Sequence, residues 1–183
     1  HYTIPVTDEL VISPCTNVTM SNGVRIYVEG RITVEGTSNC PVYFDYSGGG
    51  DHMGIQFNSS SNGRGSKIDN ASIVHSTYGI TVYGSDPYLA NVTIWNPDDV
   101  GVDLFNSATP TIRNLVIDEA GQDWNFPNYW RYGIGMSIGA GSAPNIDGLL
   151  VNDAVTRGLN VWGSSGGLIR NLTLTNITGA TLA

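Results

Sequence analysis

Apolar and polar residues alternate along this chain in short runs, and the runs recur at a nearly constant spacing. Each copy begins with Gly-apolar-x-apolar, continues through a turn of small residues, and ends with an apolar residue, x, Asn and a second apolar run. Four copies begin at Gly79, Gly101, Gly135 and Gly158, and a looser copy begins at Gly54. Alternation with a period of two predicts strands with one buried face. A repeat of roughly twenty residues built from such strands predicts a solenoid.

Asparagine occupies one position of the repeat at Asn70, Asn91, Asn114 and Asn171, and Gly148 takes that position in one copy. The steps between these positions are 21, 23, 34 and 23 residues. A sharp bend between strands needs a residue that tolerates the left-handed backbone conformation, and Asn and Gly both do so. We therefore predict a structural column of asparagines at stacked bends, with amide hydrogen bonds passing from coil to coil.

The repeat predicts an all-β chain, a parallel β-helix of about seven or eight coils that forms a single domain over residues 1–183. Strand-like runs at 17–20, 24–28, 31–34 and 41–44 extend the pattern towards the N-terminus. Leucine-rich repeats are excluded because their Leu-rich consensus and outer helical segment are missing. Ankyrin, tetratricopeptide and propeller repeats are excluded because they are longer.

The amino-acid composition limits the classes of binding partner and the cellular compartment that fit this chain. Charged residues make up 13% of the chain, against roughly 25% in average soluble domains, and Lys67 is the only lysine. A net charge of -8 argues against nucleic acid and anionic membranes as partners, and no apolar run reaches the length that crosses a membrane. The chain begins at His1 rather than Met, which we interpret as a processed or trimmed terminus. These features favour an extracellular or cell-surface protein.

Cys15 and Cys40 lie 25 residues apart, about one coil of the early region. Residues one coil apart stack, so we predict a disulfide between neighbouring turns, with two buried free thiols as the alternative. Six Asn-x-Ser/Thr sequons are candidate glycosylation sites. Asn58 and Asn176 are the better candidates, because the other four fall at bend positions where the amide is already engaged. These four are Asn17, Asn70, Asn91 and Asn171.

An aromatic insertion at about 120–132 is the strongest indication of a binding site. The step from Asn114 to Gly148 is 34 residues rather than 23, which is 11 more. The inserted residues include aromatic side chains and an arginine, types enriched at interfaces and suited to stacking on sugar rings. The candidate residues are Trp124, Phe126, Tyr129, Trp130, Arg131 and Tyr132. A loop folded back over its own coil explains this composition equally well.

Two short segments resemble catalytic motifs of polygalacturonases. The run from Gly133 to Gly139 is similar to the Gly-His-Gly-Leu-Ser-Ile-Gly motif of that family, and Asp98-Asp99 is similar to its paired acid. Ile134, however, stands where the resemblance requires the catalytic His. Glycoside cleavage needs two carboxylates held across one bond, which two adjacent residues of a turn do not supply alone. We therefore predict no catalytic residues and no required cofactor.

A polysaccharide lyase would need a base beside carboxylates that bind calcium. Asp98, Asp99, Asp103 and Asp123 form an acidic neighbourhood in which a calcium ion fits, with a solvated acidic edge as the alternative. The three histidines show no metal-ligand spacing.

The Gly-Ile-x-Val and Ile-x-Asn-x-x-Ile repeats across residues 54–174 resemble the right-handed parallel β-helix repeat proteins of the secreted and cell-surface type, within the pectin-lyase-like superfamily in the broad sense. The resemblance implies a single-stranded right-handed parallel β-helix. It specifies the fold rather than an activity.

Our first functional hypothesis is a non-catalytic extracellular structural protein that stacks end to end into a filament or forms part of a larger surface protein. Strand-like residues at 2–4 and 172–178, with no helix or polar cap, suggest this self-association or pairing with neighbouring coils. The alternative is a carbohydrate-binding or polysaccharide-degrading module that uses the 124–132 loop and the acidic edge, with glycans as partners.

Overall fold

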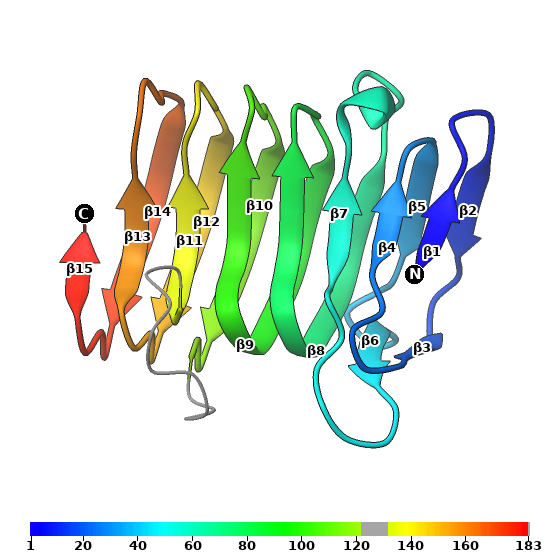
Figure 1. Cartoon of the computed structure of the whole chain (residues 1–183), viewed down its shortest axis with the longest axis horizontal. Helices are drawn as coiled ribbons and strands as arrows, with labels where there is room; N and C mark the ends of the chain where they lie inside the picture. The colour runs from blue at the N-terminus through cyan, green and yellow to red at the C-terminus, as the bar shows by residue number, and fades with distance from the viewer. Residues whose placement is uncertain (122–131, 183) are drawn as a thin grey trace.

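The structure is a computed structural model that describes residues 1–121 and 132–182. The chain winds as a solenoid whose coils lie side by side from the N-terminal to the C-terminal end (Figure 1). The strands of successive coils pair in parallel. The parallel β-helix predicted from the repeat is therefore confirmed.

Three faces, each a row of parallel strands, surround the interior of the solenoid. The first face consists of β1 (Tyr2–Ile4), β4 (Ile26–Val28), β7 (Ile55–Phe57), the ends of β8 (Lys67–Tyr83) and β9 (Tyr88–Phe105), β11 (Ile134–Ile138), β13 (Arg157–Val161) and β15 (Ala180–Leu182). The second consists of β2 (Glu9–Ile12), β5 (Arg31–Glu35) and the beginnings of β8, β9, β10 (Thr111–Asp118), β12 (Asn145–Asn152) and β14 (Leu168–Thr175). The third consists of β3 (Asn17–Met20), β6 (Val42–Tyr46), the middle of β8 and β9, and the ends of β10, β12 and β14.

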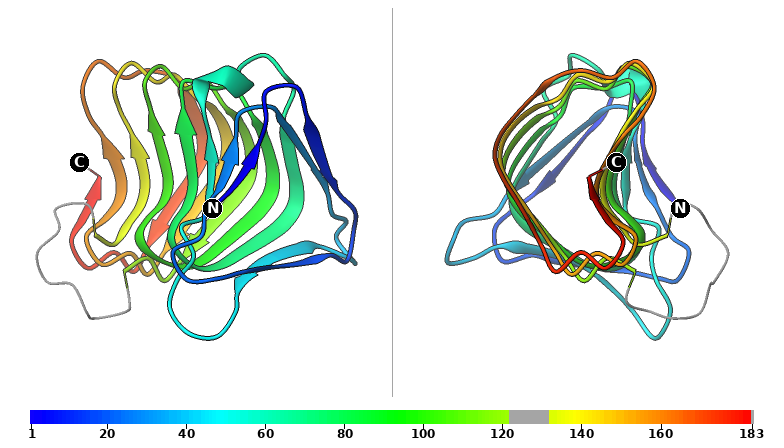
Figure 2. Two further views of the ribbon diagram at one scale, coloured as in Figure 1. Left: turned by 45° about the vertical axis from the view of Figure 1, so that its right-hand side comes forward. Right: turned by 90° about the vertical axis from the view of Figure 1, so that its left-hand side faces the viewer.

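The first face has eight rungs and the other faces have seven each in the described residues, as the repeat predicted. A short 3₁₀ helix, η1 (Ser59–Ser61), lies in the connection between β7 and β8. Seen along the solenoid, the early coils in blue and cyan reach further out than the later ones (Figure 2).

Like side chains stack over like in the interior. On the third face, Ile94 of β9, Ile117 of β10, Val151 of β12 and Leu174 of β14 follow one another in register. The first three are fully buried. Burying an aliphatic side chain of this size stabilises the fold by about 1.5–3 kcal/mol, so these columns are a main source of stability.

The glycine that begins each repeat is required by close packing. A β-carbon on Gly101 would lie 2.5 Å from Ile117 Cγ2 and 2.6 Å from the carbonyl oxygen of Gly135. Gly79 has the same surroundings one coil earlier, where its β-carbon would lie 2.6 Å from Ile94 Cγ2. The backbone thus passes directly over an apolar side chain of the third face, and a larger residue does not fit there.

The predicted asparagine column lies at the bend between the second and third faces. Asn70, Asn91, Asn114 and Asn171 have φ angles of 49°, 51°, 51° and 53°, and Gly148 has 84°. The amide ladder is shorter than predicted: Asn114 Nδ2 donates to Asn91 Oδ1 at 3.0 Å. Asn171 instead donates to an aspartate, because Gly148 leaves no side chain below it. The main role of the column is therefore to hold the backbone in the left-handed conformation at each bend. Its side chains do not form a continuous hydrogen-bonded chain.

A second column of left-handed residues separates the third face from the first. It comprises His75, Asn96, Glu119, Asp153 and Asn176, with φ between 51° and 57°. The sequence pattern missed this bend because its residue types differ from coil to coil.

Cys15 and Cys40 form a disulfide, as predicted. Their Cα atoms are 4.7 Å apart, and the Cys15 N–H donates to the Cys40 carbonyl oxygen at 3.2 Å. The strands that follow them, β3 and β6, are parallel neighbours. The bond therefore joins two adjacent turns near the N-terminal end of the solenoid.

Most of the aromatic insertion lies outside the described residues. This applies to Trp124, Phe126, Tyr129, Trp130 and Arg131, whereas Tyr132 lies in a turn before β11. The binding prediction for this loop stays a prediction. No helix in the described part of the chain is long and apolar enough to span a membrane.

Candidate functional site

The outer side of the third face carries hydroxyl and aromatic side chains in three consecutive coils. Tyr43 of β6, Ser72 of β8 and Thr93 of β9 lie side by side in register and point outward, since their strand neighbours are buried. Tyr43 is 43% exposed. On the second face, by contrast, Arg31 forms an ion pair with Glu9 at 3.2 Å.

Three rings form a ladder at the far end of the same strands. Tyr46, His75 and Trp95 belong to successive coils, and we call them the aromatic ladder. The ring centroids of Tyr46 and His75 are 5.1 Å apart, and those of His75 and Trp95 are 5.0 Å apart, both edge to face. This spacing follows the distance of roughly 4.8 Å between paired strands. His75 Nδ1 also lies 3.4 Å from Asp45 Oδ1, so the middle ring is held from three sides.

A hollow of about 230 Å³ lies at the near end of these strands. One wall is the disulfide segment, residues 36–41, whose Thr37 and Cys40 exchange backbone hydrogen bonds of 3.1 and 3.0 Å. The lining residues are Thr37, Ser38, Pro41, Tyr43, Asn70, Ala71, Ser72, Asn91 and Thr93. The hollow is therefore lined by hydroxyl, amide and aromatic groups and by no charged side chain.

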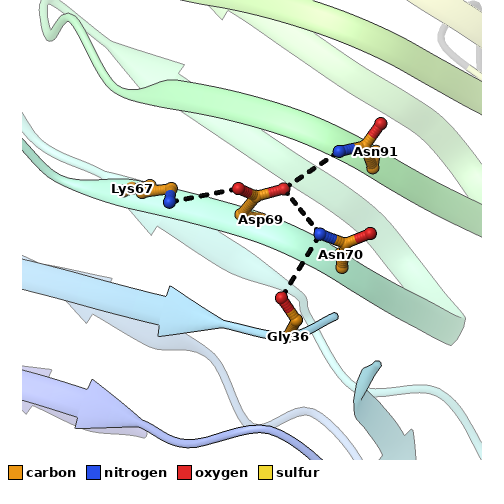
Figure 3. Close-up of polar contacts among 5 residues, drawn as sticks. All are labelled: Gly36, Lys67, Asp69, Asn70 and Asn91. Atoms are coloured by element: carbon orange, nitrogen blue, oxygen red, sulfur yellow. Dashed lines mark hydrogen bonds and ion pairs between the residues drawn. The ribbon is translucent and has the colours of Figure 1, made fainter. Parts of the chain in front are cut away.

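A hydrogen-bonded cluster next to the hollow orients two of its amides (Figure 3). The Asp69 carboxylate contacts Lys67 Nζ at 3.1 Å and accepts hydrogen bonds from Asn70 Nδ2 at 2.9 Å and Asn91 Nδ2 at 3.0 Å. Asn70 Nδ2 also donates to the Gly36 carbonyl oxygen at 3.2 Å. Both NH₂ groups face Asp69, so both side-chain carbonyl oxygens point away from it (Figure 3). Asp69 thus determines that the carbonyl oxygens of Asn70 and Asn91, rather than their NH₂ groups, point away from the cluster.

A buried histidine fastens the segment between β6 and β7 next to the ladder. His52 Nδ1 accepts the Gly54 N–H at 3.0 Å, and Nε2 lies 3.1 Å from the Val74 carbonyl oxygen. Nε2 must therefore carry the proton, and the ring is neutral. Burial lowers the pKa of His52 from its ordinary value, which favours this neutral form. Val74 directly precedes His75, so this contact holds the backbone next to the middle ring of the aromatic ladder.

The comparisons with known proteins agree with this architecture. A family model described as "Right handed beta helix region" matches residues 7–178. The chain belongs to this right-handed β-helix family. Its coils are accordingly right-handed, as the sequence resemblance implied.

A solved member of this fold is similar over most of the chain. The crystal structure of alginate lyase from Paenibacillus sp. str. FPU-7 superimposes with a TM-score of 0.55 and 14% identity, covering 93% of this chain. The chain spans 65% of that lyase. At this identity the likeness shows the fold alone. No curated protein matches.

The right-handed β-helix spreads the acidic residues predicted to bind calcium over two faces. Asp98 and Asp99 lie half-buried where β9 turns from the third face to the first, and Asp103 is buried on the outer side of the first face. Asp123 lies outside the described residues. Within the described ranges, no three His, Cys, Asp or Glu side chains are grouped to hold a metal ion. The calcium site therefore stays a prediction.

The β-helix places the sequons differently from the sequence analysis. Asn58 is half-buried, and its amide bonds to Glu29 and Gln56. Asn176 is exposed and donates to Asn152 at 2.9 Å. Asn17 begins β3 rather than occupying a left-handed bend, and it is exposed. The asparagines of the other bend sequons form the hydrogen bonds described above. Asn17 is therefore more accessible than these for the attachment of a glycan.

Sequence reasoning did not find Tyr43, Tyr46, His75 or Trp95 as a group, because they lie up to 52 residues apart. Outward-facing aromatics in corresponding strand positions were the available signal. They become neighbours only once the coils are stacked in the observed register.

Proposed function

We propose that this right-handed β-helix binds an uncharged polysaccharide across the outer side of its third face, outside the cell. The proposal rests on one observation: the aromatic ladder and the polar hollow lie on the same three coils. Tyr43 and Tyr46 are three residues apart on β6, which corresponds to about 10 Å along a strand. A glycan that runs along these strands therefore contacts both features at once.

The chemistry of the face suits a sugar. Aromatic rings pack against the apolar C–H side of a pyranose, while amide and hydroxyl groups exchange hydrogen bonds with its hydroxyls. Tyr43, Ser72 and Thr93 supply hydroxyls, and the oriented carbonyl oxygen of Asn70 lies at the edge of the hollow.

The charge distribution favours a neutral ligand over a polyuronate. The chain carries -8 overall, and Lys67, the cation next to the hollow, is paired with Asp69. A polyanion would be repelled by the net charge, and the ammonium group of Lys67 is already neutralised by Asp69. We accordingly propose binding without the cleavage that the name of the alginate lyase describes.

The disulfide supports the proposed location outside the cell. The Cys15–Cys40 disulfide is of a kind that persists in secreted proteins and is rare in the cytosol. Extracellular glycans are then the accessible partners.

Trp95→Ala and Tyr43→Ala are each expected to weaken binding of a neutral hexasaccharide about tenfold, equal to about 1.4 kcal/mol. Isothermal titration with cellohexaose, mannohexaose and hexaguluronate measures this effect. Tyr88→Ala is the matched control, because Tyr88 is a similarly exposed tyrosine (40%) on the second face. Trp124→Ala and Trp130→Ala show whether the aromatic loop contributes.

Either of two results would contradict the proposal: no heat with the two neutral glycans, or equal losses in Tyr88→Ala and Tyr43→Ala. Shortened glycans after prolonged incubation would instead support the polysaccharide-degrading alternative.

A second candidate, the end-to-end stacking of chains into a filament, is favoured by the first coil. There a cavity of about 590 Å³ opens onto interior side chains, among them Leu10, Ile12, Met20 and Ile26. A second copy stacked by its last coil would cover this cavity and continue all three faces in parallel.

Stacking predicts that the mass from light scattering rises with protein concentration. Val11→Lys, at an outward position of β2 that is 55% exposed, is expected to keep the chain monomeric, since edge lysines oppose strand pairing. Tyr88→Lys, away from the first coil, serves as the control. A single-chain mass at every concentration would exclude self-assembly.

A further inference from the structure

A second aromatic surface lies at the corner between the first and second faces. Tyr83 ends β8, Phe105 ends β9, Gly139 follows β11 and Trp162 follows β13. The registers place these four positions in one column across successive coils. The ends of these strands line up along the top of Figure 1.

Gly139 forms a seat for the indole ring of Trp162. A β-carbon on Gly139 would lie 2.5 Å from both Cδ2 and Cζ2 of Trp162, so the ring lies directly over the glycine. Trp162 Nε1 donates to Ser137 Oγ at 3.1 Å. Trp162 is nevertheless 45% exposed. One side of the ring is therefore packed and fixed, and the rest faces solvent.

The two earlier coils of the same column also carry aromatic side chains. Tyr83 and Phe105 pack edge to face with centroids 5.1 Å apart, and Tyr83 is 38% exposed. Ser165 Oγ donates to the Trp162 carbonyl oxygen at 2.6 Å, which fixes the turn that follows Trp162.

The part of this corner around Trp162 is uncharged in a strongly acidic chain. Three of the four segments that build the corner, 104–112, 133–146 and 158–169, contain no Asp, Glu, Lys, Arg or His, although the chain carries -8 overall. The fourth segment, after Tyr83, contains Asp86, which accepts the Gly63 N–H at 2.7 Å. Complementarity of charge therefore selects a ligand that is itself uncharged.

We propose that Trp162, on its Gly139 seat, is a stacking platform for a neutral sugar ring and a second glycan-binding site. A rigid indole with one open face binds the apolar side of a pyranose at little entropic cost, since its rotamer is already fixed by Gly139 and Ser137. The platform is built from residues that take no part in the third-face site. It stands whether or not the third face binds glycans.

The test uses the Trp95→Ala background, in which binding at the third face is expected to be about tenfold weaker. The indole N–H resonance of Trp162 is identified by its absence in Trp162→Phe. Titration with cellohexaose or mannohexaose is expected to shift this resonance saturably, whereas hexaguluronate leaves it unchanged. Trp162→Ala is expected to weaken binding at least about tenfold, and Trp162→Phe less.

Gly139→Ala provides a second variant that keeps the indole. Its β-carbon would lift the ring from the seat, so we expect a loss of affinity similar to that of Trp162→Ala with the tryptophan still present. Tyr88→Ala controls for unrelated surface effects, and thermal midpoints verify that each variant is folded. An indole resonance unmoved by both neutral glycans, or wild-type affinity in folded Trp162→Ala, would overturn the proposal.

Discussion

Replacing both cysteines, Cys15→Ser together with Cys40→Ser, is expected to lower the free energy of unfolding by about 3.5 kcal/mol. The disulfide closes a loop with a sequence separation of 25 residues, and removing it restores that loop's freedom to the unfolded chain. Urea denaturation followed by circular dichroism measures the change.

The loss of stability should be largest near the missing disulfide, in addition to lowering the stability of the whole chain. In a solenoid each coil contacts only its neighbours, so amide exchange is expected to accelerate most in the two turns that the bond joins, around β3 and β6. The double variant Ser13→Ala with Ser38→Ala alters exposed neighbours of the cysteines and should change little. Two titratable thiols in the native protein would refute the disulfide itself.

Gly101→Ala is expected to destabilise the fold by about 3 kcal/mol, the upper part of the range for overpacked sites. The added β-carbon would meet Ile117 on one side and the Gly135 carbonyl oxygen on the other. Ile117 is fully buried, and Gly135 belongs to the paired strand of the next coil, so neither is free to move aside. Thermal and urea unfolding both report this change.

Gly166→Ala is the matched control for that variant. Nothing lies within 4 Å of a β-carbon at Gly166, and its backbone is not left-handed. Its free energy of unfolding should therefore stay within about 0.5 kcal/mol of the wild type. Equal stability of the two variants would mean that the repeat glycine has no packing role.

The fold could be predicted from the sequence because one structural need recurs in every coil. Gly79, Gly101 and Gly135 all lie where the backbone crosses an apolar side chain, and only glycine fits there, so the pattern is visible. The bend at His75, Asn96 and Glu119 has no such signature, because a different residue type adopts the left-handed conformation in each of these coils.

The candidate binding surfaces could not be predicted in the same way. The sequence analysis found aromatic residues that are close in sequence, in the 124–132 loop. Tyr46 and Trp95, however, lie in different coils and each contacts His75, so the three rings come together only when three coils stack. Similarly, Trp162 becomes a platform because Gly139, 23 residues earlier, leaves room for its ring.

The glycine that begins each repeat also explains how a chain of this kind can change length. Gly79 and Gly101 are 22 residues apart, and Gly135 and Gly158 are 23 apart. Duplicating one such unit inserts a rung into every face, and the flanking coils meet the same backbone and the same interior column as before. Growth by tandem duplication therefore needs no compensating mutations elsewhere, and it moves surfaces on either side of the new unit apart by about 4.8 Å.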